Sequence, residues 1–109
     1  MFNGLWTVEF NSSINQYGTG VLVINNDKLL GGDEFYYYYG SCNIEGVNIS
    51  GTLMVVKYNP SGISVFGNID HFQLIFSGTI NDYQFDVTGA IANDHNMQIH
   101  IVGTKREDL

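Results

Sequence analysis

A run of five consecutive aromatic residues, residues 35–39, constrains the fold of this chain more than any other feature. A Gly-Gly-Asp step at 31–33 comes shortly before the run, and Gly40 ends it. Aromatic side chains favour β-strands, where consecutive side chains point to opposite faces. A strand with large rings on both faces needs cover on both faces. In a chain of 109 residues, this predicts a closed or nearly closed sheet with aromatic rings inside.

The composition predicts a single folded domain over residues 1–109. Hydrophobic residues make up 44% of the chain and charged residues 14%, which excludes a disordered chain. The longest apolar run, residues 20–24, has the length of a strand and is far shorter than a membrane span. The start of the chain lacks the basic and apolar regions of a signal peptide, and Cys42 is the only cysteine. We therefore expect a cytoplasmic protein without a disulfide.

The formal net charge of −7 limits the classes of partner. Nucleic acids and anionic lipids attract clustered cations, and this chain has four Lys and Arg residues against eleven Asp and Glu residues. We expect no direct binding to nucleic acid or to membranes. A basic protein is a compatible partner.

Alternation of apolar and polar residues predicts strands along almost the whole chain. The expected strands are 5–11, 18–25, 28–30, the aromatic run through 44, 47–58, 72–80, and two more around 85–91 and 97–101. Short turns join most of them, for example 25–27, where Asn and Asp tolerate positive φ. The prediction is an all-β fold, an eight-stranded antiparallel up-and-down barrel, with a β-sandwich as the alternative. Glycines inside strands favour the barrel, because closing a small sheet needs bends.

The inside of such a barrel is a candidate ligand cavity. We place on its inner surface a set of large apolar side chains: Trp6, Phe10, Phe35, Tyr37, Tyr39, Phe72, Leu74, Phe76 and Phe85. Tyr36 and Tyr38 then point outward, as candidates for a dimer or partner surface. The alternative is that the inner rings only fill the core. An apolar small molecule is the ligand class that such a cavity would take.

Catalytic and metal sites are not expected. We interpret Asp33 as a turn carboxylate that accepts hydrogen bonds from backbone N–H groups, because no partner group for acid catalysis lies nearby in sequence. The three histidines, His71, His95 and His100, show no ligand spacing typical of zinc. Cys42 lies far from them in sequence, so no nucleophile, base and orienting group can be assembled. We therefore predict no enzyme activity, no cofactor and no metal.

Residues 4–6 (Gly-Leu-Trp) resemble the Gly-x-Trp signature of lipocalin-like, or calycin, barrels. The resemblance implies that Trp6 closes one barrel end and packs against a basic residue after the last strand. Lys105 and Arg106 are the candidates for this role. A cation–π contact of that kind contributes about 1 kcal/mol.

Over nearly its whole length the chain is similar to the GrlR-like negative regulators of bacterial type III secretion. The matching segments are 4–8, 18–23, the step Gly31, Gly32 and Asp33 with Gly40 after it, 64–67, 77–78, 88–89 and 104–109. The resemblance implies a calycin barrel that acts without catalysis, forms a homodimer and sequesters a helix-turn-helix transcriptional activator. The structural motif carried over comprises Gly4, Trp6, Gly31, Gly32, Asp33 and Arg106. The best-understood branch carries an acidic run between its fourth and fifth strands, where this chain has the single carboxylate of Glu45.

Overall fold

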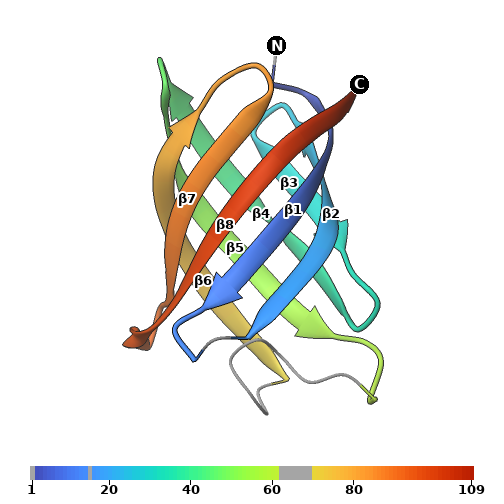
Figure 1. Ribbon diagram of the computed structural model, residues 1–109, viewed down its shortest axis with the longest axis vertical. Helices are drawn as coiled ribbons and strands as arrows, with labels where there is room; N and C mark the ends of the chain where they lie inside the picture. Colours follow the sequence, from blue (N-terminus) through green and yellow to red (C-terminus); the bar gives the residue numbers. More distant parts are fainter. Residues whose placement is uncertain (1, 15, 62–69) are drawn as a thin grey trace.

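The protein is an eight-stranded antiparallel barrel in which every strand pairs with its neighbours in sequence (Figure 1). The computed structural model describes residues 2–14, 16–61 and 70–109, and segment 64–67 of the family resemblance lies outside them. The strands are β1 (Gly4–Ser12), β2 (Tyr17–Asn25), β3 (Lys28–Gly32), β4 (Tyr36–Glu45), β5 (Asn48–Lys57), β6 (His71–Ile80), β7 (Gln84–Ile91) and β8 (Asp94–Asp108). The predicted barrel is confirmed, and the sandwich alternative is wrong.

Pairing of the first and last strands closes the sheet. β1 pairs antiparallel with β8 from Gly4↔Asp108 to Ser12↔Ile99, with one register shift between Leu5 and Trp6. β8 continues to residue 108, well beyond the predicted segment, because its second half pairs with the first half of β1. Closure gives each strand two partners, so the sheet has no free edge along its length except where neighbouring strands differ in length.

Alternation along the strands gives the barrel an apolar inside. Each strand has buried inward residues and mostly exposed outward ones, as in β6 with Phe72, Leu74 and Phe76 buried between exposed neighbours. Trp6, Ile24 and Leu74 are the largest fully buried side chains. The inward residues predicted for β1, β6 and β7 are confirmed: Trp6, Phe72, Leu74, Phe76 and Phe85 are buried, and Phe10 packs partly buried against the core.

The two ends of the barrel differ. The chain termini lie together at one end, which we call the terminal end, with the short β2–β3 turn (Figure 1). Asn26 and Asp27 of that turn have φ of 50° and 71°, which confirms the predicted positive-φ turn. At the opposite end, which we call the loop end, lie the connections β3–β4 and β7–β8, the last residues of β1 and β5 and the first residues of β2 and β6.

The predicted orientation of the aromatic strand is wrong. Tyr36 and Tyr38 point into the barrel and are 4% and 7% exposed, whereas Tyr37 and Tyr39 point outward and are each 45% exposed. The outer rings stack on each other with centroids 6.2 Å apart. Phe35 precedes β4 and packs partly buried against the core. The side chains of the strand therefore alternate between the two faces as expected, but each of these tyrosines lies on the face opposite to the predicted one. Within one chain, the outer face of the strand stays half exposed.

Downstream residues on the same strand explain this phase. Ser41 and Asn43 share the outer face with Tyr37 and Tyr39, whereas Cys42 lies inside with Tyr36 and Tyr38. The five aromatic side chains are too similar to show which of them face the inside of the barrel. The polar side chains further along the strand do show it, because they require solvent and so mark the outer face.

Gly31 shows why the Gly-Gly step precedes the aromatic run. A Cβ at residue 31 would lie 2.1 Å from the carbonyl oxygen of Val21 and 2.9 Å from Cα of Leu22 on the neighbouring strand. Those contacts are with backbone, so no side-chain rotation relieves them. β3 and β2 approach so closely here that only glycine fits.

We expect Gly31→Ala to lower the free energy of unfolding by about 1–3 kcal/mol, through the forced separation of β2 and β3. Urea unfolding followed by circular dichroism measures the change. Lys28→Ala, on the exposed side of the same strand, is the matched control and should change stability by less than about 0.5 kcal/mol. Equal stability of Gly31→Ala and the wild type would contradict the close approach.

Candidate functional site

A cavity of about 660 Å³ lies inside the barrel. Its wall is mainly apolar and is formed by inward side chains from the strands, together with the segment between β3 and β4. Of the predicted cavity residues, the wall includes Phe10, Phe35, Phe72, Leu74, Phe76 and Phe85. Tyr36 and Tyr38, predicted to point outward, also line it, whereas Tyr37 and Tyr39 lie outside. The wall also includes Leu53, Val55 and Ile99, and the aliphatic side chains of Leu22, Ile24 and Leu29, whose faces the sequence pattern had not assigned.

Pairs of glycine and aromatic residues keep the middle of the barrel open. Phe10 pairs with Gly18 across β1 and β2, and a Cβ on Gly18 would lie 2.4 Å from the ring of Phe10. Phe85 lies in the same way against Gly103, its partner on β8. Each ring thus lies close against the wall over a residue without a side chain. Large rings cover the wall in this way and leave space in the centre.

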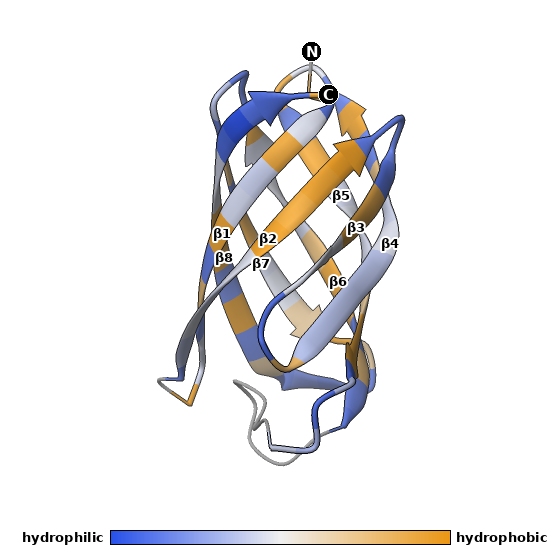
Figure 2. Cartoon of the chain, turned by 90° about the vertical axis from the view of Figure 1, so that its right-hand side faces the viewer, coloured by the Kyte–Doolittle hydropathy of each residue, from blue (hydrophilic) through white to orange (hydrophobic). Residues whose placement is uncertain are grey.

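The cavity extends to the loop end on the side where β2 runs past β3. Pairing of β2 with β3 begins only at Val21↔Gly32, so the first residues of β2 continue beyond the end of β3. Gly18 and Gly20 of β2 line the cavity on one side of this mouth, and residues 32–35 line it on the other. Figure 2 faces this side, with β2, β3 and β4 next to one another.

Asp33 connects the segments at the mouth of the cavity through hydrogen bonds. Its Oδ1 accepts hydrogen bonds from the backbone N–H groups of Phe35 and Tyr36, both at 2.9 Å. Its Oδ2 accepts the hydroxyl proton of Tyr38, and its backbone carbonyl accepts a 2.7 Å hydrogen bond from the hydroxyl of Tyr58. The prediction that Asp33 is a turn carboxylate is confirmed. The sequence did not show that the same carboxylate fixes a tyrosine inside the cavity.

Burial and the neighbouring Asp33 carboxylate both raise the pKa of Tyr38 far above its usual value. Tyr38 is therefore a neutral hydrogen-bond donor whose proton points at Asp33. Burial, with a smaller contribution from Asp27, also raises the pKa of the Cys42 thiol, to about 11. Cys42 therefore stays a neutral thiol near pH 7.

Lys57 is the basic side chain that reaches the loop end from the inner face. It pairs with Tyr36 in the β4–β5 register, and its Nζ lies 5.9 Å from the centroid of the Tyr36 ring. The same Nζ forms a salt bridge of 3.2 Å with Asp70. The charge of Lys57 is therefore shared between a carboxylate and an aromatic face.

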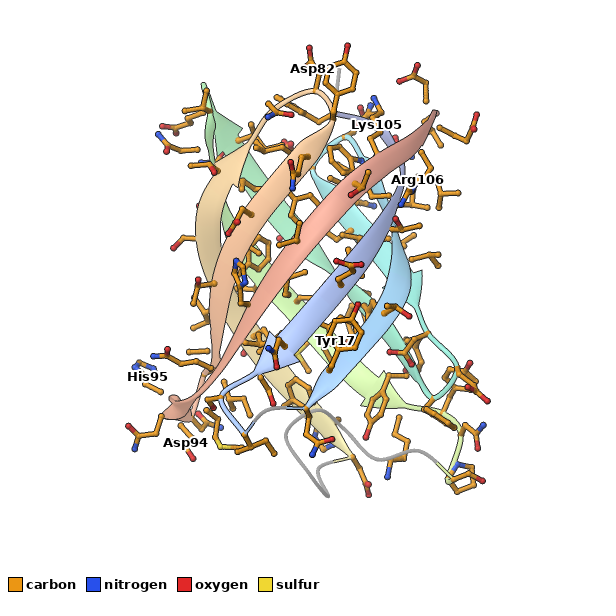
Figure 3. The ribbon with its side chains drawn as sticks, in the orientation of Figure 1. Tyr17, Asp82, Asp94, His95, Lys105 and Arg106 are labelled. Atoms are coloured by element: carbon orange, nitrogen blue, oxygen red, sulfur yellow. The ribbon has the colours of Figure 1, made fainter. Side chains whose placement is uncertain are left out.

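Trp6 closes the terminal end. It is fully buried, its ring packs against Phe85 with centroids 5.2 Å apart, and its Nε1 donates to the carbonyl of Phe2 at 3.0 Å. Lys105 is the cross-strand partner of Trp6, while Arg106 points outward and donates from Nε to Oγ1 of Thr7 at 2.9 Å. Of the two candidates (Figure 3), Lys105 is thus the basic residue beside Trp6, and Arg106 is not.

The histidines are dispersed over the outer surface. His100 lies 2.7 Å from the carboxylate of Asp86 on the neighbouring strand, and His71 and His95 are exposed at other positions. Within residues 2–14, 16–61 and 70–109, no group of three or more His, Cys, Asp or Glu side chains is arranged to hold a metal ion. The same part of the chain contains no helix long and apolar enough to cross a membrane.

Fold and site together define a small closed β-barrel with an apolar internal cavity and an acidic mouth at the loop end. No protein-family model and no curated protein sequence matches this chain.

The raised pKa of Tyr38 predicts a loss of stability in alkali. Above about pH 10 the unfolded chain releases this proton while the folded protein keeps it, so unfolding becomes more favourable. The free energy of unfolding should fall from this group by about 1.4 kcal/mol per pH unit. Below pH 10 both states hold the proton, and the contribution is constant.

Urea unfolding between pH 9 and pH 11 tests this in Tyr38→Phe. We expect a shallower decline of stability than in the wild type, with Tyr39→Phe, on the outer face of the same strand, retaining the wild-type slope. Identical slopes in both variants would show that Tyr38 is not the group that couples folding to alkaline pH.

Proposed function

We propose that the protein is a non-catalytic binding protein that holds a small apolar molecule inside its barrel. The cavity of about 660 Å³ carries this proposal. Ligand pockets for small molecules usually span about 300–1,000 Å³ and combine an apolar wall with a few polar groups. This cavity has both, because aliphatic and aromatic side chains form its wall and Asp33 and Tyr38 stand near its mouth.

The glycine–aromatic pairs support a space that is kept open by the fold. Phe10 and Phe85 lie across from Gly18 and Gly103, where they meet no opposing side chain. A core that only needed filling would place larger residues at these glycine positions. The arrangement favours an interior that accepts a ligand.

A neutral apolar dye tests the proposal. We expect Nile red to bind the wild type with increased fluorescence, and Leu53→Trp, which places an indole in the cavity, to weaken binding by about tenfold, or about 1.4 kcal/mol. Fluorescence titration measures both affinities.

Ser50→Trp is the matched control, because residue 50 lies on the exposed face of the same strand. Its dye affinity should equal that of the wild type. Thermal unfolding establishes that both variants fold. A wild type that does not bind the dye, or a folded Leu53→Trp that binds it with unchanged affinity, would contradict a ligand-accepting cavity.

A second candidate function is regulation through protein binding, as the family resemblance implies. It is favoured by an apolar surface on the outside of β2–β5, which we call the outer apolar face. The register aligns Val23, Leu30, Tyr39 and Met54 in one row, and Val21, Tyr37 and Val56 in the next. Leu30 is 58% exposed. Contiguous exposed apolar surfaces of this kind usually mark contacts with other proteins.

We propose a second copy of the chain as the occupant of this face. Two copies that each carry a charge of −7 repel one another unless they meet where no charges face each other. The two rows of the outer apolar face contain no charged side chain, and tyrosines such as Tyr37 and Tyr39 are enriched at interfaces. The acidic remainder of the surface suits a basic DNA-binding activator, the partner class that the resemblance implies.

The double substitution Tyr37→Ser/Tyr39→Ser tests the dimer. We expect the wild type to sediment as a dimer and the double variant to dissociate at least about tenfold more readily, because two stacked rings leave the interface. Analytical ultracentrifugation measures the dissociation constant.

Tyr83→Ser is the control, since Tyr83 is 77% exposed at the β6–β7 turn, away from the outer apolar face. It should leave the dimer unchanged. A monomeric wild type, or a double variant with the wild-type dissociation constant, would rule out this face as the dimer interface.

A further inference from the structure

Three side chains that line the cavity, those of Asp33, Glu34 and Tyr38, can offer a ligand only hydrogen-bond acceptors, while Tyr17, Thr19 and Tyr36 add hydroxyl groups to the lining. The carboxylates of Asp33 and Glu34 accept hydrogen bonds and do not donate them. Tyr38 has one proton, and it is committed to Oδ2 of Asp33, so its oxygen is left with lone pairs alone. The three side chains line the same cavity.

The charge at the mouth has one sign. Among the described residues that line the cavity, Asp33 and Glu34 are the charged ones, and neither forms a salt bridge with another described residue. The connecting segment 62–69 contains no charged residue in its sequence. Lys57 reaches this end of the barrel, but its Nζ is paired with Asp70 and it does not line the cavity.

We infer that the ligand is an amphiphile with a hydrogen-bond-donating, positively charged head group, such as a long-chain amine. This inference rests on the proposed ligand-binding function. The hydrocarbon part would occupy the apolar wall region, and the ammonium group would lie at the mouth between Glu34, Asp33 and the oxygen of Tyr38. The ring of Phe35, at the same mouth, offers an aromatic face to the cation.

A fatty acid of the same length is the disfavoured ligand. Its carboxylate would meet two carboxylates and the acceptor oxygen of Tyr38, and the described residues that line the cavity include no cation to pair with it. An alcohol has one donor and no charge, so it ranks between the amine and the acid. The order of affinities therefore reports the chemistry of the mouth, while the hydrocarbon contribution stays constant.

Competition against Nile red with dodecylamine, dodecanol and dodecanoate at pH 7, below their micelle concentrations, measures this order. We expect the amine to bind at least about tenfold more tightly than the acid, and the ratio to shrink as salt is added. Glu34→Gln should reduce the amine-to-acid ratio about threefold, because one exposed carboxylate is removed.

Glu45→Gln separates a local effect from that of total charge. Glu45 is an exposed carboxylate at the β4–β5 turn, at the terminal end and outside the cavity wall, and its substitution changes the net charge by the same amount. The ratio should stay at the wild-type value in this variant. An equal drop in Glu45→Gln and Glu34→Gln would overturn the inference and assign the preference to total charge.

The remaining outcomes distinguish the two proposals. Equal affinities, or tightest binding of dodecanoate, would overturn the head-group inference and leave the ligand-binding function standing. A dodecanoate preference that Lys57→Met abolishes would assign the head group to Lys57. If Nile red binds and none of the three amphiphiles displaces it, the head-group inference fails alone. If Nile red itself does not bind, both proposals fail.

Discussion

The pairing of β1 with β8 is the interaction on which the rest of the structure depends. It joins the two ends of the chain, from Gly4↔Asp108 to Ser12↔Ile99, and turns a meander of hairpins into a closed wall. Without it both terminal strands would expose unpaired backbone, and the inward side chains would have no opposite wall to face. Trp6, which closes the terminal end, is part of the same β1–β8 pairing, because its cross-strand partner is Lys105 of β8. Closure therefore creates both the core at the terminal end and the space toward the loop end.

How much of that space stays empty is decided by paired residues of unequal size. A ring opposite a glycine lies along the wall, as Phe10 does at Gly18 and Phe85 at Gly103. The cross-strand contact thus covers the backbone of the glycine and leaves the barrel axis free. Near the mouth, Asp33 joins the same wall to the β3–β4 connection through two backbone N–H groups and the hydroxyl of Tyr38. One carboxylate therefore shapes the loop and sets the polarity of the cavity entrance.

Site residues could be predicted from the sequence only where the polarity of the side chains shows which face of a strand is buried. The inward residues of β6 were predictable, since Phe72, Leu74 and Phe76 alternate with polar neighbours. The aromatic run gave alternation without phase, because a tyrosine fits either face, and Tyr36 and Tyr38 were assigned to the wrong one. The polar residues Ser41 and Asn43, eight to ten residues after Asp33, could have shown which face of the strand points outward. The role of Asp33 in the loop was predictable from its position after two glycines, whereas its bond to Tyr38 depends on strand geometry.

The amino-acid sequence by itself determined the strand content, the order of the strands, the tight turns and the apolar inside, because these depend on local propensity and on a period of two. The tertiary structure alone decided which tyrosines face inward, that Lys105 rather than Arg106 lies beside Trp6, and where the cavity reaches the loop end. Each of these depends on register between strands, and a shift of one residue moves every side chain of a strand to the opposite face. Register in turn is set by contacts between distant segments, such as the approach of Gly31 to the backbone of Val21. Local sequence cannot fix such contacts, since they form only when the whole sheet closes.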